Sequence, residues 1–512
     1  MENRSQWGTR AGFILAAVGS AVGLGNIWRF PATAFENGGG AFMIPYLVAL
    51  LTAGIPILVM EFTMGHRYRG SAPLTYKKMN KNTEWIGWWG VLVAFVISTY
   101  YSVIIAWAIS YSIFSFNLNW GEDTEGFLFG SYLETAAPGE FGGFVPSVLI
   151  PLIIVWLIVL GVLYRGVKKG IEMANRIFIP TLVVVFLIIV IRAITLPGAV
   201  EGLNAFFTPD FGAIMDAQVW VAAYGQIFFS MSIAFAIMIT YSSYLPKKSD
   251  ITNNAFMVGF GNSSFELLCG IGVFSVLGFM AVSQSVAVDD VVAGGVGLAF
   301  VVFPQIINQF PALSELFGFL FFASLVLAGL SSLISIIETY VAGLSDKFNI
   351  SRQKAVIFGG GFAALVSLVF ATRGGLNFLD AADYFINQFG VAFVGLVEVV
   401  LIAWVLRKLG TFKDHANEIS DIKLGGWWTV SLGVITPIVL GYTMVDLFRT
   451  NLMQLFDTET GNYAGYPDSF ILFSGWFIAG GALVVAIVMA LFKWKSARAV
   501  NENESQNTGE AR

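Results

Sequence analysis

The sequence predicts an all-α polytopic membrane protein with twelve transmembrane helices. Hydrophobic residues make up 56% of the 512 positions and charged residues only 12%, whereas a soluble domain carries about 25% charged residues. The mean hydropathy is +0.75. Apolar stretches of about 20 residues, the length that crosses a bilayer as a helix, recur along the whole chain. These three observations together exclude a soluble globular fold.

Short polar loops separate the apolar stretches and define the expected spans. The spans lie near residues 9–34, 38–66, 86–116, 144–163, 172–195, 217–245, 253–283, 316–345, 353–372, 381–406, 426–446 and 468–493. The last residues, 496–512, are rich in Asn, Glu, Gln and Ser, a composition typical of a disordered tail. The single cysteine, Cys269, excludes an intrachain disulfide.

Positive charge is distributed unevenly between the two sides of this topology. One side holds most of the Lys and Arg residues, from Arg4 before the first span to Arg498 after the last. The opposite side keeps almost only Arg29, Arg192, Arg373 and Arg449. By the positive-inside rule, both termini and the 496–512 tail are cytoplasmic. The expected location is the plasma (inner) membrane, which the chain crosses many times.

The first span contains a stretch that a continuous membrane helix does not favour. Residues 19–31 have the sequence GSAVGLGNIWRFP, with three glycines in its first seven positions. Backbone polar groups must be paired in hydrocarbon, so an unwound turn persists there only where it lines a cavity or binds a ligand. Freed carbonyls suit a small hard cation, and amides at the start of the next half-helix suit a carboxylate. A glycine-rich packing surface is the alternative, but it leaves Asn26 and Arg29 unexplained.

This stretch, followed by ENGGGAF, closely resembles the first transmembrane segment of the neurotransmitter:sodium symporters, and most of all their prokaryotic amino-acid branch. The resemblance implies one transporter domain over residues 1–512. Residues 9–195 and 217–406 would form a 5+5 inverted repeat with broken helices 1 and 6. Residues 426–493 would supply helices 11 and 12. The sixth segment has no strong helix breaker, so only its position at the start of the second repeat supports a break there.

The resemblance also implies two Na⁺ sites built from oxygen ligands. The first would use Ala21, Asn26, Ser230 and Asn262. The second would use Gly19, Val22, Ala328, Ser331 and Ser332. Carbonyl, amide and hydroxyl oxygens are hard ligands that suit Na⁺. Adjacent serines in a membrane helix more often bond to their own backbone, so the serine pair gains meaning only from the resemblance.

The same resemblance assigns a substrate pocket and two gates. The pocket would be lined by Ser20, Ala21, Leu24, Gly25, Ile97, Tyr101, Phe229, Ser230, Ser232, Ala234, Phe235, Ser332 and Ile336. Tyr101 would donate a hydrogen bond to a substrate carboxylate. The outer gate would be formed by Arg29, Asp383 and Phe235, and the inner gate by Arg4, Trp7, Tyr244 and Asp346. A further carboxylate in the second span, Glu61, is interpreted as a buried hydrogen-bond acceptor and not as a ligand.

Two positions bear on the subclass. Amine carriers of this family have a carboxylate where this chain has Gly23, so the substrate here should supply its own. Chloride-dependent members have a serine where this chain has Glu266, four residues after Asn262. A fixed carboxylate can replace the anion beside Na⁺, which predicts chloride independence. Protonation of Glu266 with empty sites would let the return step export a proton. A purely structural role for Glu266 is the alternative.

The expected function is therefore sodium-coupled uptake of neutral, hydrophobic or aromatic L-amino acids by alternating access, and not an enzymatic reaction. The bilayer and the small substrate are the expected partners, without nucleic acid, and a homodimer stays open. A channel would favour repeated pore-lining rings, which this pattern lacks. An amino-acid sensor that does not transport could share every binding residue. Proton coupling in place of Na⁺ is opposed by the pair Ser331 and Ser332.

Overall fold

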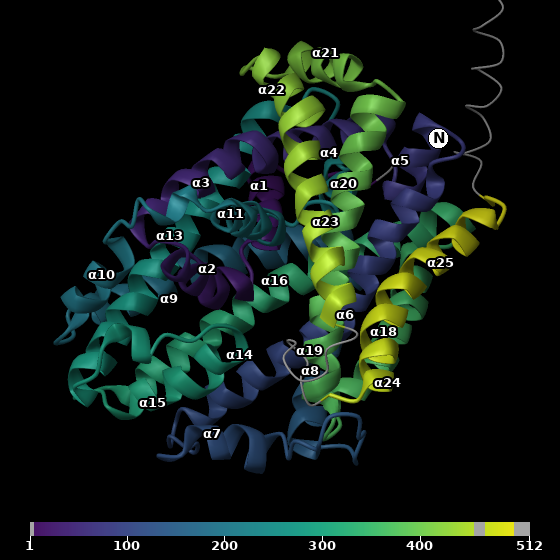
Figure 1. Cartoon of the computed structure of the whole chain (residues 1–512). Helices are drawn as coiled ribbons and strands as arrows, with labels where there is room; N and C mark the ends of the chain where they lie inside the picture. Colours follow the sequence, from purple (N-terminus) through teal and green to yellow (C-terminus); the bar gives the residue numbers. More distant parts are fainter. Residues whose placement is uncertain (1–4, 455–465, 496–512) are drawn as a thin grey trace, which may run out of the picture.

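In the computed structural model of the chain, residues 5–454 and 466–495 are described. Their regular structure is helical. Two isolated bridges, Gly39 with Pro209 and Phe144 with Thr372, are the β contacts among the described residues. Figure 1 shows the helices running through one bundle, with short loop helices at both ends.

Every predicted span coincides with a helical segment. The first six are α1 (Arg10–Ala21) with α2 (Leu24–Glu36), α3 (Met43–Ala49) with α4 (Ile55–Tyr68), α6 (Glu84–Phe114), α8 (Pro146–Tyr164), α9 (Met173–Ile194), and α11 (Ala217–Ser230) with α12 (Ile237–Ser242). The last six are α13 (Ile251–Gln284), α16 (Ser314–Phe348), α17 (Arg352–Ala355) with α18 (Gly361–Ser367), α19 (Gly375–Phe385) with α20 (Ala392–Val400), α22 (Gly426–Val430) with α23 (Thr436–Gln454), and α24 (Asp468–Ile471) with α25 (Phe477–Leu491). Short π-helical or 3-10 stretches join several of these paired helices.

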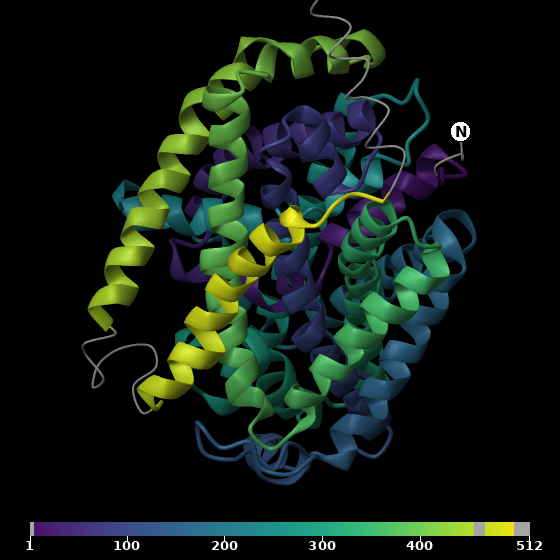
Figure 2. The ribbon, with the colours of Figure 1, turned by 90° about the vertical axis from the view of Figure 1, so that its right-hand side faces the viewer.

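The loop helices gather at opposite ends of the bundle. At one end lie α7 (Thr124–Gly126), α14 (Gly295–Gly297) and α15 (Phe303–Asn308), the last two between the seventh and eighth spans. At the other end lie the first described residues and α21 (Leu409–Ile419) (Figure 1). The chain thus begins on the side of α21. Figure 2 shows α23 along one outer edge of the bundle and α25 across its front.

The first span breaks where the glycines predict it. The axes of α1 and α2 meet at 54°. Val22 and Gly23 between them are extended, with φ/ψ of −71°/97° and −125°/−169°. The Asn26 side chain caps the new helix, because its Oδ1 accepts the Gly23 N–H at 2.8 Å. The α2 helix then continues for 13 residues, through Pro31.

The sixth span breaks without any glycine. Between α11 and α12, Ser232, Ala234 and Ala236 have φ values of 52°, 70° and 70°. A left-handed conformation costs an L-residue about 1–2 kcal/mol, so other contacts must hold this turn. One is the carboxylate of Glu61 on α4, whose Oε1 accepts the Ala234 N–H at 2.6 Å. The interpretation of Glu61 as a buried acceptor is therefore confirmed.

Candidate functional site

A small cavity lies where the two broken helices meet. Its volume is about 70 Å³. It is lined by Ser20, Ala21, Gly23, Leu24, Gly25, Asn26, Ile97, Tyr100, Tyr101, Phe229, Ser230, Ser232, Phe235, Ser332, Ile336, Asp383, Asn387 and Val391. The lining contains every residue predicted for the pocket except Ala234. It thus draws on α1, α2, α6, α11, α16 and the tenth span.

The polar end of the cavity is the start of α2. The Leu24 N–H donates to the Tyr101 hydroxyl at 3.2 Å. A helix N-terminus presents unpaired N–H groups and a partial positive charge. Gly23 leaves room there, since a Cβ at that position would lie 3.0 Å from the Tyr101 hydroxyl and 3.2 Å from Ser332 Oγ. This end suits a carboxylate.

Apolar side chains also line the cavity. Ile97, Phe235, Ile336 and Val391 contribute its walls. Ala234 takes a different place, because its N–H donates to Glu61 and its methyl group faces α20. A Cβ built on Gly395 of that helix would lie 3.1 Å from the Ala234 Cβ. The cavity therefore combines a helix start that suits a carboxylate with apolar walls that suit a hydrocarbon side chain.

The residues proposed for the first cation site are in mutual contact. Asn26 Nδ2 donates to Asn262 Oδ1 at 2.8 Å, and Asn262 Nδ2 donates to Ser230 Oγ at 3.2 Å. All three side chains are buried. Helices α2, α11 and α13 thus bring neutral oxygens together beside the break at Ala21. Such a donor set fits a hard monovalent cation.

The residues proposed for the second cation site also converge. Ser331 Oγ lies 2.8 Å from the carbonyl oxygens of both Gly19 and Ala328. Ser332 Oγ lies 3.3 Å from the carbonyl oxygens of Gly19, Ser20 and Val22. One hydroxyl proton cannot serve three carbonyls. This excess of acceptor oxygens over donors, buried between α1 and α16, again fits a cation.

A buried carboxylate stands next to the first cation site. Glu266 Oε1 accepts from Gln226 Nε2 at 2.6 Å, Oε2 accepts from the Tyr46 hydroxyl, and Ser230 also hydrogen-bonds to it. The sequence pattern indicates Glu266 as a functional residue, but it does not indicate its partners Tyr46 and Gln226. Gln226 lies four residues before Ser230 and therefore on the same face of α11, a spacing that could have indicated it.

At the outer end, the predicted gate residues lie near one another without closing. Arg29 stacks on the Phe229 ring, with its Cζ 4.4 Å from the centroid. Asp383 accepts from Asn387 Nδ2 at 2.8 Å and interacts with Tyr100. Among the described side chains, no ion pair within 4.0 Å joins Arg29 and Asp383. Phe235 lines the cavity from the sixth-span break.

At the inner end of the bundle, Trp7 packs beside α12, on the inner side of the sixth-span break. Its Nε1–H donates to the Tyr241 carbonyl at 2.8 Å, and its ring centroid lies 6.4 Å from that of Tyr244. Asp346 accepts the Ser71 N–H at 2.8 Å. Arg4, the remaining predicted gate residue, lies outside the described residues. The Trp7 contacts tie the start of the chain to α12.

The inner end also contains a buried ion pair that the sequence analysis did not identify. Arg352 donates two hydrogen bonds of 2.6 Å to Glu338, which also accepts from the Tyr244 hydroxyl at 2.7 Å.

Losing one partner of a buried pair costs about 3–5 kcal/mol, because the other charge stays uncompensated. We therefore expect Glu338→Ala to lower the apparent melting temperature of the detergent-solubilised protein strongly. Tyr244→Phe, which removes only the hydroxyl, should lower it much less, and equal effects would contradict this role.

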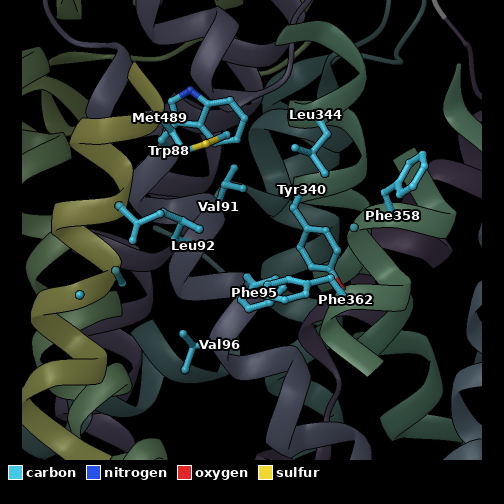
Figure 3. Close-up of a pocket in the computed structure, with 14 residues that line it drawn as sticks. Trp88, Val91, Leu92, Phe95, Val96, Tyr340, Leu344, Phe358, Phe362 and Met489 are labelled. Carbon is cyan, nitrogen blue, oxygen red and sulfur yellow. The ribbon is translucent and has the colours of Figure 1, made fainter. Parts of the chain in front are cut away.

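A second cavity, of about 460 Å³, lies away from the broken helices. Figure 3 shows Phe95, Tyr340, Phe358, Phe362 and Met489 among its walls, contributed by α6, α16, the ninth span and α25. Almost all of its lining side chains are apolar. It offers neither the amide-rich helix start nor the converging oxygens of the smaller cavity, so it does not fit a zwitterion with a cation.

Comparison with known proteins gives concordant results. A model of the sodium:neurotransmitter symporter family matches residues 4–137 and 142–497. An uncharacterised sodium-dependent transporter from Methanocaldococcus jannaschii is 41% identical over 491 residues, covering 96% of this chain and 98% of the relative. Sodium-dependent dopamine transporters of Caenorhabditis elegans and Bos taurus are each 28% identical, covering 97% and 96% of this chain and 88% and 75% of their own lengths.

Among solved structures, the chain is similar to the crystal structure of MhsT in complex with L-phenylalanine. The TM-score is 0.74 and the sequence identity 33%, over 86% of this chain and 99% of MhsT. This similarity confirms the predicted fold class. The exact boundaries of the two repeats stay predictions.

Proposed function

Since the chain belongs to the sodium:neurotransmitter symporter family, we propose that it takes up neutral, hydrophobic or aromatic L-amino acids together with Na⁺ by alternating access. The observation that carries this proposal is the cavity between the broken helices, which is lined by the start of α2 and by the apolar side chains of Ile97, Phe235 and Ile336. The relatives described by function in their names are transporters, which supports transport over catalysis.

In the proposed complex, the substrate carboxylate accepts hydrogen bonds from Tyr101 and the first amides of α2. It also approaches the first Na⁺ site, formed by Ala21, Asn26, Ser230 and Asn262. Opposite charges in contact attract far more strongly in a water-poor cavity than in water, so each ligand raises the affinity for the other. Gly23 leaves space for the carboxylate, and the apolar end selects the side chain.

The second Na⁺ ion would be bound by the carbonyls of Gly19, Val22 and Ala328 with the hydroxyls of Ser331 and Ser332. These ligands join α1 to α16 directly. A cation here would hold the inner half of the first span against the rest of the bundle. Its release would free α1, which is the movement that alternating access requires at the inner end.

We further propose that transport needs no chloride, because Glu266 supplies a fixed negative charge beside the first site. If Glu266 binds a proton when both sites are empty, the return step exports that proton. Equal uptake rates in chloride and gluconate media test the first statement. Alkalinisation of the vesicle interior, followed with a trapped pH-sensitive dye during Na⁺-driven uptake, tests the second.

The decisive experiment is reconstitution in liposomes with radiolabelled hydrophobic amino acids, L-phenylalanine among them. An inward Na⁺ gradient should drive concentrative uptake, and replacing Na⁺ by K⁺ should abolish it. Na⁺-dependent binding without uptake would identify a sensor and overturn the transporter proposal. Absence of both binding and uptake would refute the assignment of the pocket.

Removing one ligand of the second Na⁺ site should weaken the response to Na⁺. A hydrogen bond or ligand contact to a charged group is worth about 1.5–3 kcal/mol. We therefore expect Ser331→Ala to raise the half-saturating Na⁺ concentration about tenfold or more in the uptake assay. Ser324→Ala is the matched control, because Ser324 lies on the same helix and, among the described residues, bonds only to the Phe321 carbonyl. The same Na⁺ response in both variants would count against the site.

The topology proposal places both termini on the cytoplasmic side of the plasma (inner) membrane. Cysteines introduced in α21 and in α15, at opposite ends of the bundle (Figure 1), should react with an impermeant thiol reagent from opposite sides. Cys269 is buried and should not interfere. A homodimer is the oligomeric state we propose to test by cross-linking in the membrane.

A further inference from the structure

Two buried carboxyl groups meet beside the sixth-span break, away from both cation sites. Glu61 on α4 and Glu398 on α20 are 0% and 1% exposed. Their carboxyl groups interact directly, and the Tyr76 hydroxyl of α5 (Ala72–Met79) contacts Glu398. Among the described residues, Glu61, Glu398 and Tyr76 are the titratable groups that interact at this point. Neither carboxylate therefore has a cation to compensate its charge.

Each of these two carboxyl groups has one oxygen without a hydrogen-bond donor among the described residues. Glu61 Oε1 accepts the Ala234 N–H, but Glu61 Oε2 has no donor. Glu398 Oε1 also has no donor, although Tyr76 can serve the other oxygen of that carboxyl. Both orphan atoms are fully buried. Unpaired polar atoms in a dry interior are costly, and two carboxylates in contact cannot both be ionised there.

We propose that Glu61 and Glu398 bind one proton between them, at a site separate from Glu266. One O–H···O⁻ hydrogen bond would satisfy both orphan oxygens and leave a single charge, shared over the pair. Charge-assisted bonds of this kind are short and strong. The proton completes a chain in which Tyr76 donates to Glu398, Glu398 donates to Glu61, and Glu61 accepts from Ala234.

The bound proton also supports the break itself. Ala234 has a left-handed backbone, and Glu61 holds its N–H. Three residues before Glu398, Gly395 packs so closely that a Cβ there would lie 2.6 Å from Phe228 Cε1 and 3.1 Å from the Ala234 Cβ. Loss of the proton would place two negative charges between α4 and α20 and separate them. The packed break is therefore present when the proton is bound and is lost as pH rises through the titration of the pair.

Infrared difference spectroscopy tests the site without any need for transport. The purified protein, titrated from neutral to alkaline pH, should lose the C=O stretch of a protonated carboxyl group. The band of the shared proton should be missing in Glu398→Gln and present in Glu266→Gln. Any separate signal that comes from Glu266 should be missing in Glu266→Gln. A band that persists in Glu398→Gln and in Glu61→Gln would overturn the proposal.

Uptake in liposomes provides the second test. Wild-type uptake should decline at alkaline pH, because loss of the shared proton disrupts the break. Glutamine at position 398 can donate an N–H to Glu61 and accept from Tyr76. Glu398→Gln should therefore retain Na⁺-driven uptake and lose this alkaline decline. Glu398→Ala cannot donate and should be inactive or unstable. An alkaline decline in Glu398→Gln equal to that of the wild type would refute the shared proton. Because the infrared result is independent of flux, a protein that does not transport amino acids still tests this site.

Discussion

Glu266→Ser should convert the protein from a chloride-independent into a chloride-dependent transporter. In gluconate medium, Na⁺-driven uptake should fall by two orders of magnitude or more, and added chloride should restore much of it. The reason is electrostatic: Glu266 hydrogen-bonds to Ser230, a proposed ligand of the first Na⁺ site. At about 4 Å and an effective dielectric constant of about 20, one charge pair is worth about 4 kcal/mol. The serine would remove that charge and leave space for an anion.

Glu266→Gln is the control for this experiment. It removes the same charge, but its amide fills the space between Tyr46 and Gln226 that chloride would need. Uptake should therefore be low in both gluconate and chloride. Uptake by Glu266→Ser at the wild-type rate without chloride would show that the carboxylate does not compensate Na⁺. Rescue of Glu266→Gln by chloride would place the anion elsewhere.

Gly23→Asp should abolish amino-acid uptake. A side chain at this position points at the Tyr101 hydroxyl and at Ser332 Oγ, where a Cβ would lie 3.0 Å and 3.2 Å away. The new carboxylate would therefore occupy the place proposed for that of the substrate. Repulsion between two carboxylates of about 4 kcal/mol corresponds to an affinity about a thousandfold lower. Scintillation proximity binding with the amino acid identified by uptake gives the measurement.

Gly23→Ala separates charge from bulk in this prediction. The backbone of Gly23 is extended, with φ of −125°, so alanine is compatible with its conformation. We expect a moderate loss of affinity from the added methyl group and a much larger one from the aspartate. Equal losses would show that space and not charge decides the position. An amine that lacks a carboxylate should bind Gly23→Asp better than it binds the wild type.

The break in the sixth span is the feature that the local sequence predicts least well. Local composition predicts the first break, because three glycines interrupt an otherwise apolar helix. In the structure, Gly23 and Gly25 also leave room where Tyr101 and Phe229 approach the backbone. The second break occurs at Ser232, Ala234 and Ala236, none of which favours a left-handed backbone. Only its position at the start of a repeat predicted it. The hydrogen bond from Ala234 to Glu61, 173 residues away in sequence, helps to hold it.

The membrane class, the twelve spans and the first break are predictable from the amino-acid sequence alone. These follow from composition, from the length needed to cross hydrocarbon and from glycines that act locally. The other features emerge only in the folded protein. Folding adds Tyr100, Asn387 and Val391 to the cavity, turns Ala234 away from it, and brings Glu61 to Glu398. Each of these features depends on contacts between helices that are distant in sequence. Such contacts leave no signal in the local sequence, because they arise only when the helices pack in the folded bundle.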